Sequence, residues 1–148
     1  MRVEKDFEKF IGLLNKHDVR YLIVGGYAFS FHAEPRFTKD IDFFVDSSGD
    51  NPERLLRTLN EFGFGKLGLT RKDFLKSGQV VQLGVAPVRI DLMTSISGMD
   101  FATAWKNRIS GAFGAVRAYF ISKLDLIKNK MATGRKQDLG DIEKLQKI

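Results

Sequence analysis

Two aspartates at positions 40 and 42 open an otherwise apolar run that reads D-I-D-F-F-V. Successive side chains of a β-strand point to opposite faces, so Asp40 and Asp42 would lie on one face, roughly 6.5–7 Å apart along the strand. Like charges placed this close on a buried strand raise each other's pKa unless a cation compensates them. Mg²⁺ is the expected cation, because it prefers oxygen ligands and leaves places for water and substrate phosphates.

A pair of glycines precedes this strand. Gly25 and Gly26 follow the apolar run Y-L-I-V, and thirteen residues separate Gly26 from Asp40. Between a strand and a helix, such glycines let backbone N–H groups approach an anion, so this pair is expected to hold phosphates. A Gly-Gly pair alone is usual in a turn, and an Asp-x-Asp pair alone is usual on the solvated face of an edge strand. Their order and spacing together favour a phosphate site beside a metal site.

This order of apolar–Gly–Gly, thirteen residues and Asp–apolar–Asp–apolar resembles the pattern of the polymerase-β-like nucleotidyltransferase superfamily. Its small bacterial members include minimal nucleotidyltransferases and the abortive-infection type of toxin–antitoxin system. The superfamily accepts Ser at the second glycine position; with Gly26 there, phosphate contacts would come from the backbone alone. The resemblance covers the chain from about Tyr21 to Ile142.

The resemblance implies a metal-dependent enzyme that moves a nucleoside monophosphate from a nucleoside triphosphate to a hydroxyl group, with two Mg²⁺ ions as cofactors. No segment of the chain has a spacing that reads a base, and tRNA, a protein and a small molecule all offer a usable acceptor hydroxyl. The alternative is a catalytically silent nucleotide-binding or regulatory protein, for example one half of a toxin–antitoxin pair.

A third carboxylate, Asp91, stands in the run V-R-I-D-L-M. An acid among apolar strand residues is costly to bury without a purpose. In the resembled superfamily a third acid on a later strand faces the Asp-x-Asp pair, which assigns metal binding and catalysis to Asp91 together with Asp40 and Asp42. The alternative is an ion pair between Asp91 and Arg89, two residues away on the same face.

Cationic residues flank the pattern on both sides. Arg36 and Lys39 precede the aspartates in the stretch R-F-T-K-D-I-D, where each either contacts phosphate or neutralises the acidic strand. The later stretch from Lys130 through Gly-Arg to Asp-Leu also resembles those bacterial enzymes, and it implies that Lys130 contacts the triphosphate. Lys39 and Lys130 thus join the glycine pair as expected nucleotide-binding residues. Asp138 would brace Arg135 or start the last helix; a structural turn is the alternative for both.

The order of strands and helices read from the sequence predicts an α/β fold and one domain over residues 1–148. Strands are expected at 19–24, 40–45, 79–83 and 88–93 and within 112–120, with 79–83 and 88–93 paired as an antiparallel hairpin. Helices are expected at 3–16, 27–33, 51–62, 123–133 and 135–147. Ser122 and Gly134 are the expected N-terminal and C-terminal caps of the helix at 123–133. This arrangement is a small mixed sheet that carries the acids on one surface, with helices over the other and at the C-terminal end. In the last helix, Leu139, Ile142 and Leu145 are expected to face inward.

The composition narrows the class of protein. Of 148 residues, 43% are apolar and 28% charged, as in an ordinary globular protein, and the absence of cysteine excludes disulfides and thiolate metal sites. Two histidines argue against a zinc site built from His. The charged N-terminus and the lack of a long apolar run predict a cytoplasmic protein that does not enter the membrane.

The net charge of +6 is concentrated in the last third, where ten Lys or Arg stand against four Asp or Glu from Phe101 onward. This excess indicates an anionic substrate or a nucleic-acid acceptor, or simply a solvated helical surface. A pure nucleic-acid-binding module is the least favoured function, because no recognised reading motif is present. A chain of this length shows no separate acceptor domain, so a dimer or a partner protein is expected to add specificity.

Overall fold

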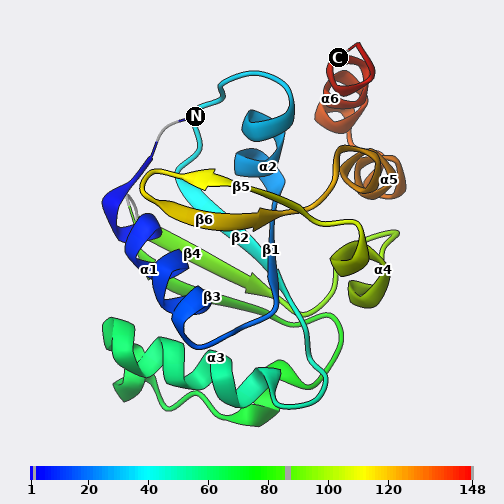
Figure 1. Cartoon of the computed structure of the whole chain (residues 1–148). Helices are drawn as coiled ribbons and strands as arrows, with labels where there is room; N and C mark the ends of the chain where they lie inside the picture. Colours follow the sequence, from blue (N-terminus) through cyan, green and yellow to red (C-terminus); the bar gives the residue numbers. More distant parts are fainter. Residues whose placement is uncertain (2, 86–87, 148) are drawn as a thin grey trace.

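The computed structural model describes residues 1, 3–85 and 88–147, and Figure 1 shows their arrangement. The helices are α1 (Lys5–Lys16), α2 (Gly25–His32), α3 (Asn51–Leu59), α4 (Phe101–Lys106), α5 (Lys123–Thr133) and α6 (Lys136–Gln146). The strands are β1 (Tyr21–Val24), β2 (Asp40–Val45), β3 (Val80–Val85), β4 (Val88–Met93), β5 (Ile109–Phe113) and β6 (Val116–Phe120). Short helical turns, Asn60–Phe64, Gly65–Leu67 and Arg71–Phe74, connect α3 to β3.

The six strands form one mixed sheet in the order β3-β4-β2-β1-β6-β5. The hairpins β3–β4 and β5–β6 form the two sides, and the antiparallel pair β1–β2 lies between them. β2 runs parallel to β4, and β1 runs parallel to β6. The predicted mixed sheet and the first hairpin are confirmed, while the stretch 112–120 contributes to two strands rather than one.

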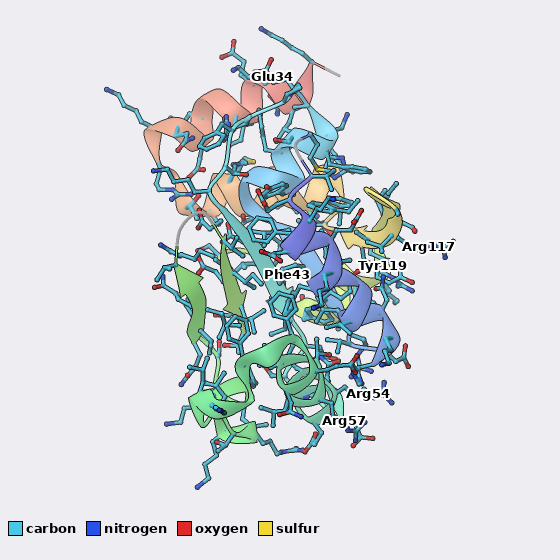
Figure 2. All side chains as sticks on the ribbon, turned by 90° about the vertical axis from the view of Figure 1, so that its left-hand side faces the viewer. Glu34, Phe43, Arg54, Arg57, Arg117 and Tyr119 are labelled. Carbon is cyan, nitrogen blue, oxygen red and sulfur yellow. The ribbon has the colours of Figure 1, made fainter. Side chains whose placement is uncertain are left out.

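Helices pack on both faces of this sheet, because apolar side chains of β2 point alternately to the two faces. Phe43 points to the face covered by α1 and α3 (Figures 1 and 2), and the centre of its ring lies 5.5 Å from that of Phe10. Phe44 points to the opposite face, in a second apolar cluster with residues of α4 and α5 such as Ala104 and Leu126. Asp40 and Asp42 share the face of Phe44, so they lie near the C-terminal helices rather than in an open surface.

The ends of α5 follow directly from the sequence. Ser122 accepts a hydrogen bond from the backbone N–H of Asp125 at 3.1 Å, and Gly134 ends the helix with a φ of 64°. These are the N-cap and the left-handed C-terminal glycine typical of helix ends. They fix the helix that carries Lys130. Within the described residues, no helix has the length and apolar character needed to span a bilayer.

The last helix agrees with its prediction at two of three positions. Leu145 is buried and Ile142 packs against the second apolar cluster, but Leu139 is 60% exposed. The other buried positions of α6 are Asp138 and Asp141, because cations from other segments lie against α6 and pair with these acids. The helix therefore presents carboxylates, and not only leucines, to the interior.

Candidate active site

Three carboxylates from two strands come together at the sheet. β2 and β4 are parallel neighbours in which Asp42 is the register partner of Asp91, and Asp40 is the partner of Arg89. One carboxylate oxygen from each of Asp40, Asp42 and Asp91 lies within 4.8 Å of the others. The structure thus brings together the three residues that the sequence singled out.

The electrostatics of this cluster call for a cation. Burial, the charges of Asp40 and Asp91, and a hydrogen bond with Asp91 raise the pKa of Asp42 to about 7. A donor set of three oxygen-bearing acids, one of which resists ionisation without added positive charge, suits a hard divalent cation such as Mg²⁺. The residues present therefore fit the metal that the fold family implies.

Arg89 supplies the nearest positive charge. Its Nε and Nη2 atoms lie 3.1 Å from the two carboxylate oxygens of Asp91, and Nη2 lies 3.8 Å from Asp40 Oδ2. The ion pair weighed as an alternative to the carboxylate cluster is therefore present together with it. The Arg89 side chain is 40% exposed, whereas that of its partner Asp91 is 5% exposed.

The glycine pair lies at the start of a helix, directly beside the carboxylates. Gly25 and Gly26 are the first two residues of α2, and Val24 pairs with Asp42 across β1 and β2. Gly25 has a φ of +66°, and a Cβ atom there would overlap Asp42 Oδ2; a Cβ atom on Gly26 would overlap Thr38 Cγ2. Glycine is required because the backbone approaches the acid so closely. The free N–H groups at the start of α2 are suited to bind an anion.

Two cavities meet at this point. The first has a volume of about 350 Å³, and we call it the cationic cavity after the four positive residues in its lining, Arg36, Lys39, Lys130 and Arg135. Its lining also includes both glycines and four acids, Asp40, Asp42, Asp138 and Asp141. The second, the neutral cavity, has a volume of about 480 Å³ and is lined mainly by uncharged residues, among them Met93, Ser95, Ile96, Ser97 and Asn129. Gly25, Asp42 and Arg135 border both cavities. A ligand at the carboxylates can therefore extend in two directions.

Lys130 lies in the wall of the cationic cavity, held by two acids of α6. Its side chain is 8% exposed, with Nζ 2.9 Å from Asp141 Oδ2 and 3.6 Å from Asp138 Oδ1. Burial opposes ionisation of Asp138, but hydrogen bonds from Arg135 and Thr133 and nearby positive charges outweigh it and lower its pKa to about 2. The two acids hold the Lys130 ammonium group in the lining of the cationic cavity.

Arg36 does not neutralise the acidic strand, which was one of its two predicted roles. It forms a two-pronged ion pair with Asp141 on α6, and its guanidinium carbon lies 3.9 Å from the centre of the Phe29 ring. Asp141 was missed in the sequence; its spacing of three from Asp138 on one helix face was the available signal. Lys39 is exposed at the rim of the cationic cavity, without an ion pair to any residue of the described ranges.

Asp138 has both of the roles proposed for it. It accepts hydrogen bonds from Arg135 Nε at 2.8 Å and from the Arg135 backbone N–H at 3.2 Å, which braces Arg135 and caps the start of α6. Arg135 is thereby held at the border of the two cavities, with 72% of its side chain exposed. The turn between α5 and α6 is structural, and it also presents a cation to the site.

Comparison with solved structures finds the same fold in two antibiotic-modifying enzymes. The crystal structure of ANT(2")-Ia in complex with adenylyl-2"-tobramycin matches with a TM-score of 0.57 and 13% identity, over 95% of this chain and 86% of that one. The lincosamide antibiotic adenylyltransferase LnuA, in its lincomycin-bound form, matches with a TM-score of 0.56 and 14% identity, over 97% of this chain and 96% of that one. No curated protein matches the sequence.

A family model described as "Nucleotidyltransferase of unknown function (DUF6036)" matches residues 1–147. The match spans nearly the whole sequence, and it agrees with the fold and with the pattern of glycines and aspartates on which the resemblance was based. The chain belongs to this family of nucleotidyltransferases.

Proposed function

We propose that this protein transfers a nucleoside monophosphate from a nucleoside triphosphate to a hydroxyl group in a Mg²⁺-dependent reaction. The observation that carries the proposal is the convergence of Asp40, Asp42 and Asp91 beside the N-terminus of α2. These three residues would hold two Mg²⁺ ions. When bound, the ions would neutralise charge on the phosphate oxygens and lower the pKa of the acceptor hydroxyl.

The residues of the chain would orient the substrate in the cationic cavity. Backbone N–H groups of Gly25 and Gly26 would bind phosphate oxygens, with Lys39 and Lys130 of the same cavity lining adding positive charge. The acceptor oxygen would attack the α-phosphorus while the bond to the β-phosphate breaks, so that pyrophosphate leaves. Asp91 would accept the proton of the hydroxyl, since its carboxylate belongs to the cluster where that oxygen must approach.

The neutral cavity would bind the parts of the substrates that carry no phosphate, which are the nucleoside and the hydroxyl acceptor. Its volume of about 480 Å³ lies within the range of 300–1,000 Å³ usual for small-molecule pockets. One structural neighbour is bound to an adenylylated tobramycin and the other is bound to lincomycin, which supports a small-molecule acceptor. A protein hydroxyl and the 3′ end of tRNA remain in the proposal as larger acceptors, and a dimer or partner protein would extend the site for them.

A transfer assay with labelled nucleotides tests this proposal. The protein is incubated with Mg²⁺ and labelled ATP, CTP, GTP or UTP, together with one of three acceptor pools: small hydroxyl compounds, tRNA, or cell lysate. The expected result is transfer of label that needs Mg²⁺ and is lost in Asp42→Asn but not in Asp6→Asn, which removes an exposed acid of α1. Nucleotide binding without transfer to any pool would show a silent nucleotide-binding protein instead. Growth arrest on expression, relieved by a co-expressed partner, would place the activity in a toxin–antitoxin pair.

A further inference from the structure

A third cavity lies at the other end of β1. Arg20 directly precedes β1 and Gly25 directly follows it, so this cavity is roughly 15 Å from the carboxylates along the strand. Its volume is about 310 Å³. We call it the arginine–aromatic cavity, because its lining includes Arg20, Trp105, Arg108, Arg117 and Tyr119. Figure 2 shows Arg117 and Tyr119 close together beside α1.

The cavity carries uncompensated positive charge. Arg20 is neutralised by Asp46, with Nε 2.7 Å from Oδ2. The acid in the lining, Asp18, is paired with Arg54 at 3.2 Å. Arg108 and Arg117 have no acidic partner in residues 1, 3–85 and 88–147. Two guanidinium groups are therefore available to an anionic ligand.

Arg108 is also held in one orientation. Its guanidinium carbon lies 3.9 Å from the centre of the Trp105 ring, and Nη1 donates a hydrogen bond to the Trp105 carbonyl at 2.8 Å. Tyr119 adds a second ring at 5.3 Å from the guanidinium carbon. Because Phe101 stacks on Trp105 at 5.7 Å and 21°, the indole is covered by neighbours. The outer plane of the Arg108 guanidinium remains as the flat surface that a ligand can stack on.

We propose that the arginine–aromatic cavity binds single-stranded nucleic acid, with an unpaired base stacked on Arg108 and the adjacent phosphate bound by Arg117. A guanidinium plane stacks on any base and also attracts phosphate, which is the combination that such binding uses. A ligand that has a phosphate but no ring would pair with the positive charge of Arg108 and Arg117 and would not stack on the guanidinium plane of Arg108. The inference concerns a site separate from the carboxylates and does not depend on the transfer reaction.

Fluorescence anisotropy with a labelled short oligonucleotide, as RNA and as DNA of the same sequence, measures this binding. The double variant Arg108→Gln/Arg117→Gln is expected to bind at least about tenfold more weakly at low salt. The slope of log K against log salt should become shallower by about 0.7, because Arg117 makes one phosphate contact and each phosphate contact to a single strand contributes about 0.7. The matched control Lys66→Gln/Lys72→Gln removes two exposed cations of the turns between α3 and β3, which do not line the cavity, and should bind as the unchanged protein does.

Three results would overturn the proposal: equal loss in the two double variants, no loss in Arg108→Gln/Arg117→Gln, or displacement of the oligonucleotide by inorganic phosphate at equal phosphate concentration. Arg108→Lys keeps the charge without the plane, so it should weaken binding and leave the salt slope unchanged; binding equal to that of the unchanged protein would contradict the stacking. A tighter complex with RNA than with DNA would identify RNA as the preferred ligand of the cavity. Stabilisation by ATP and Mg²⁺ should be the same in Arg108→Gln/Arg117→Gln, which shows that the variant is folded and separates this site from the transfer reaction.

Discussion

Asp42 on β2 and Asp91 on β4 are register partners on adjacent parallel strands, although 48 residues separate them in the sequence. This pairing places two carboxylates side by side in a partly buried position, with Asp40 two residues away on the same face. Folding alone would not favour such an arrangement, because like charges out of water repel one another. The expected consequences are a pH-dependent stability and a site that a cation stabilises.

The first prediction concerns stability in the presence of EDTA. The pKa of Asp42 is raised to about 7 in the folded protein, against about 3.9 for an unperturbed aspartate. Between these values the folded state binds more protons than the unfolded state, so stability should fall as the pH rises from about 4 to about 7 and then stay low. Asp42→Asn should remove this fall and raise the Tm at pH 8 by roughly 2–8 °C. Thermal unfolding across pH checks it, and an unchanged profile in Asp42→Asn would contradict the assignment.

The second prediction concerns Arg89, which contacts both carboxylate oxygens of Asp91. Arg89 and a bound cation compete for the same oxygens, so Arg89→Gln should reach half-maximal stabilisation at a lower Mg²⁺ concentration. That concentration should fall roughly tenfold for each 1.4 kcal/mol by which the Arg89 ion pair opposes Mg²⁺ binding. The readout is Tm as a function of Mg²⁺. Arg71→Gln is the control, since it removes an exposed ion pair with Glu53 far from the carboxylates. A higher Mg²⁺ requirement in Arg89→Gln would mean that Arg89 supports the metal site instead.

Local sequence patterns were sufficient to predict several parts of the fold and of the site. The two glycines, the Asp-x-Asp strand, the first hairpin and the Ser122 and Gly134 ends of α5 each depend on residues close together in the chain. The proximity of Asp91 to Asp42 depends instead on the parallel pairing of β2 with β4, which no local pattern encodes. The resemblance to a family supplied that relationship.

The ion pair of Arg36 with Asp141 could not be predicted, because it joins residues 105 positions apart. The inward position predicted for Leu139 was wrong for the same reason. Hydrophobic periodicity selected Leu139, whereas the buried acids Asp138 and Asp141 are stabilised by Lys130 and Arg36 from other segments and by Arg135 at the start of α6. An apolar pattern cannot reveal an interior that is built from matched charges.

The third prediction separates backbone strain from the loss of the phosphate site. Gly25→Ala places a methyl group against Asp42 Oδ2 at a φ of +66°, so it should both destabilise the fold by about 1 kcal/mol or more and abolish stabilisation by nucleotide and Mg²⁺. Gly134→Ala introduces similar strain at a φ of +64°, but the nearest atom that the methyl group would meet is the Met131 carbonyl oxygen, at 3.9 Å. It should lose stability and keep nucleotide binding. Thermal shift with ATP and Mg²⁺ tests both, and equal nucleotide binding in the two variants would argue against the glycine cradle.

The fourth prediction concerns acid sensitivity at the junction of α5 and α6. Burial opposes ionisation of Asp138, yet its cationic partners and Thr133 lower its pKa to about 2. A depressed pKa gives stability that is complete above the unfolded value of about 3.9 and is lost as the pH falls from there towards 2. Asp138→Asn should therefore lower the Tm at pH 7 and flatten the decline below pH 4, because the variant has no carboxylate to protonate.

Lys130 gives this prediction a functional readout. In Asp138→Asn, Lys130 keeps its contact with Asp141 at 2.9 Å, whereas Arg135 loses its brace at the border of the two cavities. Nucleotide binding should weaken in Lys130→Met much more than in Asp138→Asn if Lys130 contacts the triphosphate directly, since a buried cation facing phosphate contributes more than the orientation of an exposed arginine. Titration of both variants with ATP and Mg²⁺ above the pH of acid unfolding compares them. Equal weakening of nucleotide binding in the two variants would mean that Arg135, rather than Lys130, is the cation that binds the triphosphate.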